Sequence, residues 1–577
     1  MSTEKQKQGN FFKHSLNKFL AKRLETILAV AGSKMYRSFL RTTKDVEGTQ
    51  NAVLREIMTY AEGTEFGKKH HFERVRSYDD YCTNLPILDY EDHRPFVNKH
   101  AAGKENILFP GKPIMYNRSS GTTTEPKLIP VTPYNFQRTI KNRGKLWLYG
   151  LSRHYPGIYK GKSLSVVSPA VEGYTEDGTP FGSLSGVMRE NIPEFMKLTH
   201  AAPYAATLID DYDAKVYSIL RLGLANDVTV ILTGNPATVL NLVTKADAWK
   251  QDIIRDINDG TLKNDLQIST EIRRELEDGL RPMPKRAGEL ERLSSQSDRL
   301  RPRDYWPNLG LIHTWKNGNT RLVIPKLKDW FHEQTPILDF GYIASEILAT
   351  DLIDPETDGS ILQIQNGFYE FCPVEERDAP KAKLLLAHQL AAGERYYIFV
   401  TTLSGLYRYD MNDVIEVVGH LGGAPIIRFM YKGKGITNIQ GEKLSEEQFI
   451  EAVHRAAKKS DAKHDFFIGY AEPGSRQYTL YIEFTDNPKP EQIAAFAGRL
   501  DSALCEVNVE YEAKFHSSRL YPIQVVPVGE DFFSRYRQLR FEEGTHEGQI
   551  KWLQLTSTEA DRQRIEKLIA VPKPGLS

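Results

Sequence analysis

The chain has 577 residues, more than one hydrophobic core normally organises, so its length predicts two to four domains. Hydrophobic residues make up 40% and charged residues 26% of the chain, proportions typical of a globular protein. The 75 basic and 75 acidic side chains balance, so the overall charge provides no attraction for nucleic acid or an acidic membrane.

The cysteines and the apolar segments lead us to expect a cytoplasmic protein. Cys82, Cys372 and Cys505 are far apart and odd in number, which predicts neither a disulfide framework nor a cysteine metal site. No apolar run approaches the roughly 18 residues that a membrane span requires. The first residues also lack the apolar core and cleavage site of a signal peptide.

The first predicted element is helical and covers residues 11 to 62. Leu16, Leu20, Leu24 and Ile27 recur at helical spacing, and several lysines fall on the other face. A basic amphipathic helix can lie on a membrane surface or pack against its own domain. We favour packing, because the basic character is modest and the two faces are not cleanly separated.

Residues 85 to 245 alternate between short β-rich runs and helical stretches, a pattern typical of layered α/β structure. The charged segment from 251 to 303 predicts exposed helices without chemistry of their own. Strand-like segments return at 309–324, 336–344, 360–372, 395–402 and 414–418.

The segment from Tyr431 to Gly435 is basic and glycine-rich. Glycine lowers the cost of changing backbone torsions, so we predict a hinge and a domain boundary there. Beyond it we expect a helix, a strand, a second helix and a second strand, at 443–459, 478–484, 489–507 and 520–526. The predicted fold class is α/β: a large multi-layer N-terminal domain (1–431) with β-sheets flanked by helices, and a small mobile α+β C-terminal domain (432–577).

Residues 119 to 132 are the most informative stretch of the chain. The sequence Ser-Ser-Gly-Thr-Thr-Thr-Glu-Pro-Lys gathers small hydroxyl residues around Gly121 and ends at Lys127. Between two extended segments, such a loop can offer backbone N–H groups, hydroxyls and an ammonium to a polyphosphate. It is not a Walker A loop, and its composition alone also fits a solvated turn.

A second candidate is Gly341-Tyr342-Ile343-Ala344-Ser345-Glu346, which follows an apolar run. A strand that ends in a turn of small residues can stack a flat ring on Tyr342 and place Glu346 near a cation. The alternative is that Tyr342 belongs to the core and Glu346 caps a following helix.

A third candidate is Tyr407-Arg408-Tyr409-Asp410-Met411-Asn412-Asp413. A carboxylate that follows a strand often accepts hydrogen bonds from ribose hydroxyls, and both Asp410 and Asp413 qualify. The alternative is a turn whose Asp and Asn side chains hydrogen-bond to their own backbone.

Two segments near the C-terminus each carry a lysine: Gly441-Glu442-Lys443-Leu444 and Gly548-Gln549-Ile550-Lys551-Trp552. Such a lysine on a mobile domain can reach an acyl phosphate, or it can be an ordinary surface lysine. The chain has no Gly-x-Ser-x-Gly elbow of a hydrolase.

In order and spacing, these motifs resemble those of the Gretchen Hagen three family of acyl acid amido synthetases, in its bacterial form, within the adenylate-forming superfamily. The resemblance runs from about residue 50 to residue 555. Its three motifs match Ser119–Lys127, Tyr342–Glu346 and Tyr407–Asp413. Further matching segments are Thr64–Gly67, Pro86–Asp92, Trp306–Leu309 and Gly441–Leu444.

Two positions depart from the family pattern. Thr124 and Asn412 stand where the first and third motifs usually have glycine. A side chain at Thr124 restricts the loop. Asn412 tolerates left-handed backbone better than most residues, so we expect the turn there to survive.

The resemblance implies a ligase that forms a C–N amide bond and uses ATP and Mg²⁺. A small-molecule carboxylic acid is first adenylated, and the amine of an amino acid then takes the acyl group and releases AMP. In this interpretation Lys127 and Lys551 are catalytic and Glu346 binds the metal. Lys432 is the basic residue at which the hinge begins, and it also belongs to the nucleotide site. The remaining nucleotide-binding residues are Ser119, Ser120, Gly121, Thr122, Thr123, Tyr342, Ala344, Ser345 and Asp413.

Two other interpretations stay open at this point. One is a ligase of the same superfamily with another acceptor, such as coenzyme A or another amine, and the other is a relative that binds nucleotide without catalysis. The sequence does not select the acyl substrate. Its pocket is expected along 165–188 and 309–320, where Phe181, His313 and Trp315 are candidates that fit a core role equally well.

Overall fold

The computed structural model describes most of the chain, which divides into two compact units. One unit is Met1–Met411 with Glu416–Phe429, and the other is Asn412–Ile415 with Met430–Ser577. The expected boundary after residue 431 stays a prediction about domains. The described residues are 15–17, 19–21, 23–119, 127–317, 320, 323–352, 355–377, 379, 382–433, 436–437, 439–440, 442, 444–472, 475–529, 531–543 and 553–569.

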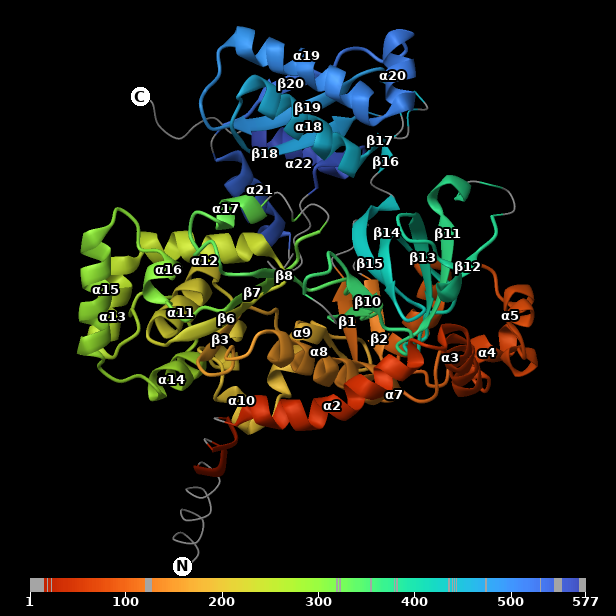
Figure 1. The fold of residues 1–577 in the computed structure, drawn as a ribbon, viewed down its shortest axis with the longest axis horizontal. Coiled ribbons are helices and arrows are strands. Elements are labelled where there is room, and N and C mark those ends of the chain that lie inside the picture. The colour runs from red at the N-terminus through yellow and green to blue at the C-terminus, as the bar shows by residue number, and fades with distance from the viewer. Residues whose placement is uncertain are drawn as a thin grey trace, which may run out of the picture. The chain divides into compact units, whose positions relative to one another are not determined.

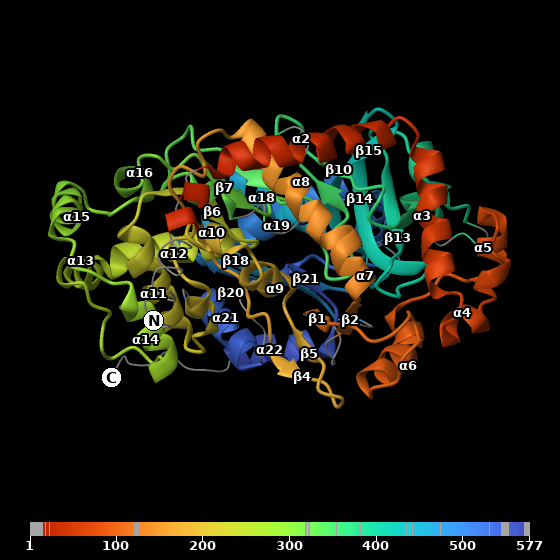
Figure 2. The ribbon, with the colours of Figure 1, turned by 90° about the horizontal axis from the view of Figure 1, so that it is seen from below.

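Two long helices replace the single helical region expected near the N-terminus. Helix α2 (Leu24–Thr42) ends just before Asp45, whose carboxylate accepts a hydrogen bond from Gly48 N at 2.9 Å and begins α3 (Val46–Ala61). Helix α2 packs along α8 (Lys141–His154), where the Tyr36 and Tyr149 rings lie 5.5 Å apart (Figure 2). The interpretation in which this region packs on its own domain is therefore confirmed for the described residues.

Short helices and a small sheet follow α3. The helices are α4 (Glu65–Lys69), α5 (Tyr78–Asn84) and α6 (Tyr90–Ala101), which share a core with Phe368 and Tyr407. The sheet has the order β2-β1-β5-β4. Its strands are β1 (Met115–Ser119), β2 (Lys127–Val131), β4 (Gly173–Tyr174) and β5 (Pro180–Gly182).

A parallel sheet of order β3-β6-β7-β8 forms the α/β layer that the sequence predicts (Figure 1). Helix α8 covers one face, where Leu151 packs with Val230 and Leu311, and α11 and α12 cover the other through Leu220 and Val239. The bounds are β3 (Lys162–Ser165), β6 (Val228–Leu232), β7 (Leu311–Thr314), β8 (Ile337–Asp339), α11 (Tyr212–Leu224) and α12 (Pro236–Ala248). The strands expected at 309–324 and 336–344 are shorter than predicted.

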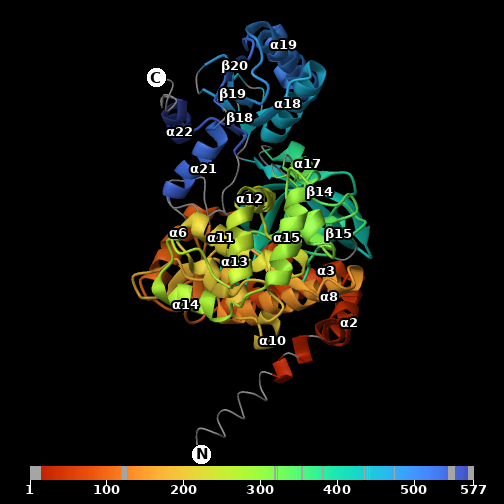
Figure 3. The ribbon, with the colours of Figure 1, turned by 90° about the vertical axis from the view of Figure 1, so that its left-hand side faces the viewer.

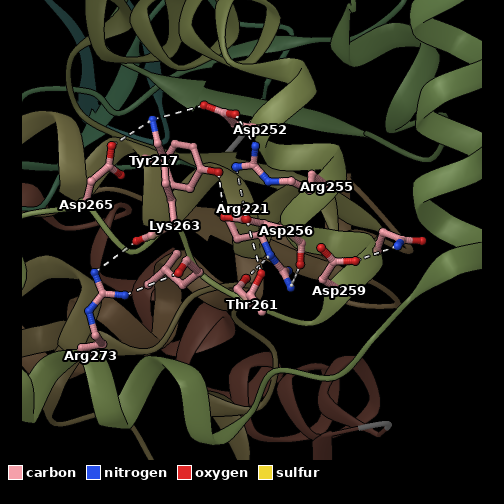
Figure 4. Close-up of polar contacts among 12 residues, drawn as sticks. Tyr217, Arg221, Asp252, Arg255, Asp256, Asp259, Thr261, Lys263, Asp265 and Arg273 are labelled. Atoms are coloured by element: carbon pink, nitrogen blue, oxygen red, sulfur yellow. Dashed lines mark hydrogen bonds and ion pairs between the residues drawn. The ribbon is translucent and has the colours of Figure 1, made fainter.

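The charged segment from 251 to 303 is helical, as expected, but it also forms a buried polar network with α11 (Figure 4). Tyr217 OH donates to Asp256 Oδ2 at 2.7 Å, and the Arg221 guanidinium donates to Asp256 O at 2.9 Å and Thr261 O at 3.0 Å. Arg221 is only 1% exposed, so these bonds fix the end of α13. The helices are α13 (Lys250–Asp259), α14 (Thr270–Asp278), α15 (Pro284–Gln296) and α16 (Pro302–Tyr305).

A seven-stranded sheet has the order β12-β11-β13-β14-β15-β10-β9. Residues 409–413 of the third motif and the expected strand at 414–418 form one long strand, β14 (Tyr409–Leu421), which pairs with β15 (Ala424–Lys432). The line between the two compact units crosses both strands. The other strands are β9 (Thr350–Asp351), β10 (Ser360–Leu362), β11 (Phe368–Pro373), β12 (Leu385–Leu386) and β13 (Arg395–Thr401).

The second unit is α+β. Its main sheet has the order β20-β19-β18-β21, and helices α18 and α19 pack side by side (Figure 3). The helices and strands expected from sequence are present, and β16, β17, β18, α20, α21, α22 and β21 are additional. The bounds are β16 (Ile436–Thr437), β17 (Leu444–Ser445), α18 (Glu446–Ser460), β18 (His464–Ala471), β19 (Tyr478–Phe484), α19 (Pro490–Val507), α20 (Val509–His516), β20 (Gln524–Pro527), α21 (Phe532–Glu542), β21 (Leu555–Thr556) and α22 (Glu559–Ile569).

The predicted fold class is confirmed: several sheets flanked by helices, with a larger N-terminal and a smaller C-terminal part. Among the helices that the structure describes, none combines the length and the apolar character that crossing a membrane requires.

Candidate nucleotide and acyl site

Strands β1 and β2 form the base of the predicted phosphate loop. They pair antiparallel, with Ser119 opposite Lys127, so the two extended segments expected on either side of the loop are confirmed. The backbone of Ser119 is described but its side chain is not. Ser120, Gly121, Thr122, Thr123 and Thr124 lie outside the described residues.

Lys127 lies between two tyrosines that sequence reasoning gave no role. Its Nζ donates a hydrogen bond to Tyr409 OH at 3.0 Å. The same ammonium is 5.2 Å from the centre of the Tyr90 ring and 5.7 Å from that of Tyr409. The Tyr90 distance is within the range of cation–π attraction. The Tyr409 contact is a hydrogen bond and not a ring-face contact, because 3.0 Å to the hydroxyl and 5.7 Å to the ring centre place the ammonium beyond the hydroxyl, near the ring plane. Both contacts stabilise a charged lysine at the base of the loop.

The second motif forms a tight turn after β8. Gly341 has φ of +78°, and a Cβ there would lie 2.4 Å from Thr350 Oγ1, so this position requires glycine. Tyr342 N donates to Thr350 Oγ1 at 2.8 Å, and the Tyr342 ring stacks on Phe429 with centroids 5.9 Å apart. The sequence-based alternative in which Glu346 caps a following helix is wrong, because the next element is strand β9.

Asn117 of β1 ties the base of the loop to this turn. Its Nδ2 donates to Ser345 O at 3.2 Å, and its Oδ1 accepts from Leu184 N at 3.2 Å. Ala344 N is bonded to Ile347 O at 2.9 Å, which closes the turn that presents Glu346. The structure therefore brings the second motif beside the strand that leads into the first, although more than 200 residues separate them in sequence.

The Glu346 carboxylate is suited to a metal shared with a ligand. It is half-buried and has no hydrogen bond or ion pair among the described residues. No group of three or more histidine, cysteine or acidic residues that could hold a metal occurs in the described part of the chain. Magnesium is commonly bound by one or two carboxylates together with phosphate oxygens and water, and a single available carboxylate fits that pattern.

A buried arginine that sequence reasoning missed supports the same turn. The Arg143 guanidinium of α8 donates from Nε and Nη2 to Thr350 O, at 3.2 and 3.1 Å. Burial lowers the pKa of Arg143 and raises the pKa of the neighbouring Asp351 to about 6. No sequence motif pointed to Arg143, because its partner is a backbone oxygen 207 residues away.

The third motif divides between two roles. Tyr407 and Arg408 are core residues: the Arg408 guanidinium is paired with the buried Glu370 at 3.0 Å, and Tyr407 OH donates to Leu108 O. Tyr409 contacts Lys127, and Asp410 is paired with Arg377.

Asn412 adopts the left-handed backbone expected of it, with φ of 51°. In the second unit, Asp413 Oδ1 lies 2.5 Å from Lys432 Nζ. The Asp413 side chain is 4% exposed, and Lys432 ends β15. The carboxylate proposed for the ribose and the lysine proposed for the hinge are thus ion-paired.

The remaining candidate residues near the C-terminus are only partly described. Lys551, Gly441 and Lys443 lie outside the described residues. Glu442 between them is fully buried and accepts hydrogen bonds from Ile439 N and Gln440 N, each at 2.7 Å, which indicates a structural role for that carboxylate.

The acyl-pocket candidates separate into two places. His313 stacks on Phe340 with ring centres 4.0 Å apart and on Trp147 at 5.4 Å, and Trp315 contacts the edge of Phe340. Burial lowers the pKa of His313 to about 3, so the ring is neutral. Phe181 is not part of this aromatic cluster, because it lies on β5 under Arg118.

Comparisons with known proteins show which sequences this chain resembles. Models described as the GH3 family N-terminal, central and C-terminal domains match residues 35–337, 360–432 and 447–560. The chain is 25% identical over 486 residues to the indole-3-acetic acid-amido synthetase GH3.6 of Arabidopsis thaliana, covering 77% of this chain and 78% of that protein. It is 24% identical over 513 residues to the jasmonoyl--L-amino acid synthetase JAR4 of Nicotiana attenuata, covering 84% and 87%.

A solved structure of the GH3.15 acyl acid amido synthetase has the same fold. It superposes with a TM-score of 0.80 at 21% identity and covers 91% of this chain and 94% of that one. The three domain models together match well over half of the sequence, in the order N-terminal, central and C-terminal. The chain therefore belongs to the GH3 family.

Proposed function

We propose that the protein is an ATP-dependent acyl acid amido synthetase that joins a small carboxylic acid to the amine of an amino acid. The observation that carries this proposal is the Asn117 bridge, which holds the turn of Glu346 beside the strand leading to the phosphate loop. The names of the relatives add support, since they are amido synthetases acting on indole-3-acetic acid and on jasmonate. Within this proposal the amino acid is the preferred acceptor.

The first half-reaction activates the acid. A carboxylate is a poor acyl donor, because oxide is a poor leaving group. Its oxygen attacks the α-phosphorus of ATP, the bond to pyrophosphate breaks, and the product is an acyl-adenylate. Negative charge on the phosphate oxygens is stabilised by Lys127 and by the hydroxyl and backbone groups of Ser119, Ser120, Gly121, Thr122 and Thr123.

The second half-reaction forms the amide. The amine nitrogen attacks the acyl carbon, the bond from that carbon to the phosphate oxygen breaks, AMP leaves, and the nitrogen loses a proton. In this proposal Lys551 approaches the adenylate, Asp413 accepts from the ribose hydroxyls, and Tyr342, Ala344 and Ser345 frame the adenine. Glu346 holds Mg²⁺, which neutralises phosphate charge when bound.

The test of the proposal is acid-dependent exchange of labelled pyrophosphate into ATP, across aromatic, aliphatic and hydroxy acids. We expect exchange with one class of acid and its loss in Glu346→Gln, a variant that keeps the shape of the side chain. Glu275→Gln, an exposed carboxylate on α14, is the matched control. An acceptor panel of amino acids, other amines and coenzyme A then identifies the product. Exchange with no acid, or exchange that survives in Glu346→Gln, contradicts the proposal.

We further propose that the second unit is a lid hinged near Lys432, so that adenylation and amine transfer are separated in time. Lys432→Pro removes torsional freedom and should impair amide formation more than pyrophosphate exchange. Lys432→Ala is the control, because it loses the same ion pair with Asp413 but keeps the freedom of the backbone. Equal losses in both half-reactions for the proline variant count against a hinge at this residue.

A further inference from the structure

Tyr90 is held in place by the start of helix α6. It is the first residue of the helix, and Asp89 caps the turn by accepting from Glu91 N at 2.7 Å and Asp92 N at 3.2 Å. Asp92 Oδ2 accepts in return from Asp89 N at 2.9 Å. This reciprocal capping fixes the backbone at Tyr90, whose side chain is only 4% exposed.

The phenol of Tyr90 binds the backbone of the residue after Lys127. Leu128 N donates to Tyr90 OH at 2.8 Å, and Tyr90 OH donates to Leu128 O at 3.2 Å. The backbone N–H and C=O of Leu128 in β2 are thus both bonded to the Tyr90 hydroxyl. The ring of the same tyrosine lies 5.2 Å from Lys127 Nζ, so Tyr90 contacts the lysine and fixes the strand that carries it.

The other side of Lys127 is fixed by the same part of the chain. Leu88, two residues before Tyr90, forms a parallel bridge with Tyr409: Asp410 N donates to Leu88 O at 2.8 Å and Leu88 N donates to Arg408 O at 3.0 Å. This bridge fixes the backbone of Tyr409 beside the residues that lead into α6. The Lys127 ammonium between Tyr90 and Tyr409 has its position set from both sides.

We propose that Tyr90 is a positioning residue for the adenylation step, which acts through Lys127 by holding its ammonium at the base of the phosphate loop. This inference rests on the proposed function, because it concerns the adenylation step. It assigns no substrate contact to Tyr90 itself. Two parts of the side chain contribute: the ring attracts the charge, and the hydroxyl fixes β2. Tyr90→Phe removes only the hydroxyl, whereas Tyr90→Leu removes both.

The experiment is a double-mutant cycle with Lys127→Ala, read by pyrophosphate exchange and by ATP binding. For Tyr90→Leu we expect a loss of about 10-fold in kcat/KM for ATP, the size of a partly desolvated cation–π contact. Tyr90→Phe should recover most of that loss and stay within about 3-fold of the wild type. When Lys127 is already alanine, Tyr90→Leu should change exchange and binding by less than about 2-fold.

Tyr305→Leu is the matched control for general loss of packing. Tyr305 is buried to 1% exposure in the helical layer and belongs to a different core cluster from Tyr90. We expect it to lower the melting temperature without changing the KM for ATP.

Three outcomes overturn the inference. The first is a 10-fold loss of kcat/KM on Tyr90→Leu that persists when Lys127 is alanine. The second is a Tyr90→Phe variant whose kcat/KM is as low as that of Tyr90→Leu, and the third is a change in the KM for ATP in the Tyr305→Leu control that equals the change in Tyr90→Leu. If the wild-type protein exchanges with no acid, the proposed function fails separately. The double-mutant cycle of Tyr90→Leu and Lys127→Ala, measured by ATP binding, then still decides whether Tyr90 acts through Lys127.

Discussion

His93 makes the fold around the site sensitive to acid. Its ring is completely buried, Nε2 accepts from Tyr407 N at 3.1 Å, and Nδ1 lies 2.8 Å from Asp89 O. Because a backbone N–H can only donate, Nε2 must be unprotonated, and Nδ1 carries the proton that is donated to Asp89 O. The ring also meets the edge of Tyr409, with centres 5.6 Å apart.

Burial lowers the pKa of His93 from 6.5 to about 4. Between these two values the unfolded chain binds a proton that the folded chain does not. The contribution of His93 to the free energy of unfolding is therefore fully present above pH 6.5 and is lost as the pH falls toward 4. At about 1.4 kcal/mol per pKa unit, the full effect is roughly 3 kcal/mol.

The assay is urea unfolding of the wild type and of His93→Gln at pH 8 and pH 5, followed by tryptophan fluorescence. Five of the six tryptophans, all except Trp552, lie in the first unit, so the signal reports mainly that unit. Glutamine can still accept from Tyr407 N but does not titrate. We expect the variant to be less stable at pH 8 and to lose about 2 kcal/mol less than the wild type between the two pH values.

The matched control is His71→Asn. His71 is half-exposed, and its left-handed backbone, with φ of 53°, suits asparagine. Four other histidines, His70, His100, His200 and His313, have pKa values lowered by burial and destabilise the fold in the same direction, so the comparison depends on the difference between variants. If His93→Gln loses as much stability as the wild type between pH 8 and pH 5, the assignment of a buried neutral His93 is refuted.

Three further perturbations test the turn, the second unit and the helical layer. Gly341→Ala forces a Cβ against Thr350 Oγ1 in a left-handed conformation, so we expect about 2 kcal/mol of destabilisation. We also expect weaker ATP binding by calorimetry, and unchanged binding would contradict the assigned geometry. Burial raises the pKa of Asp501 to about 6, so its carboxyl destabilises the fold as the pH rises from about 4 through 6. The melting temperature of Asp501→Asn minus that of the wild type should therefore increase over this range, and a constant difference would refute the shift. Tyr217→Phe removes the bond to Asp256 and should cost about 1–2 kcal/mol in urea unfolding without affecting pyrophosphate exchange; a change in exchange would link this network to the site.

The sequence by itself determined the local features of this protein. Alternating β-rich and helical runs predicted the α/β layers, and the β1 and β2 strands on either side of the proposed phosphate loop followed from the apolar segments around it. Asn412 was expected to accept a left-handed conformation and does so. These features depend on torsional preference and on burial along a few consecutive residues, which sequence patterns record directly.

Only the tertiary structure decided which of these residues meet. The Lys127 ammonium contacts both Tyr90 and Tyr409. The turn that carries Glu346 is held by Asn117 of β1 and by Arg143 of α8. The partners in each contact are separated by between 37 and 282 residues, and several of the bonds end on backbone atoms that every residue type possesses. Such contacts leave no pattern in the local sequence, because they are fixed by chain folding and by the cost of burying a polar group without a partner.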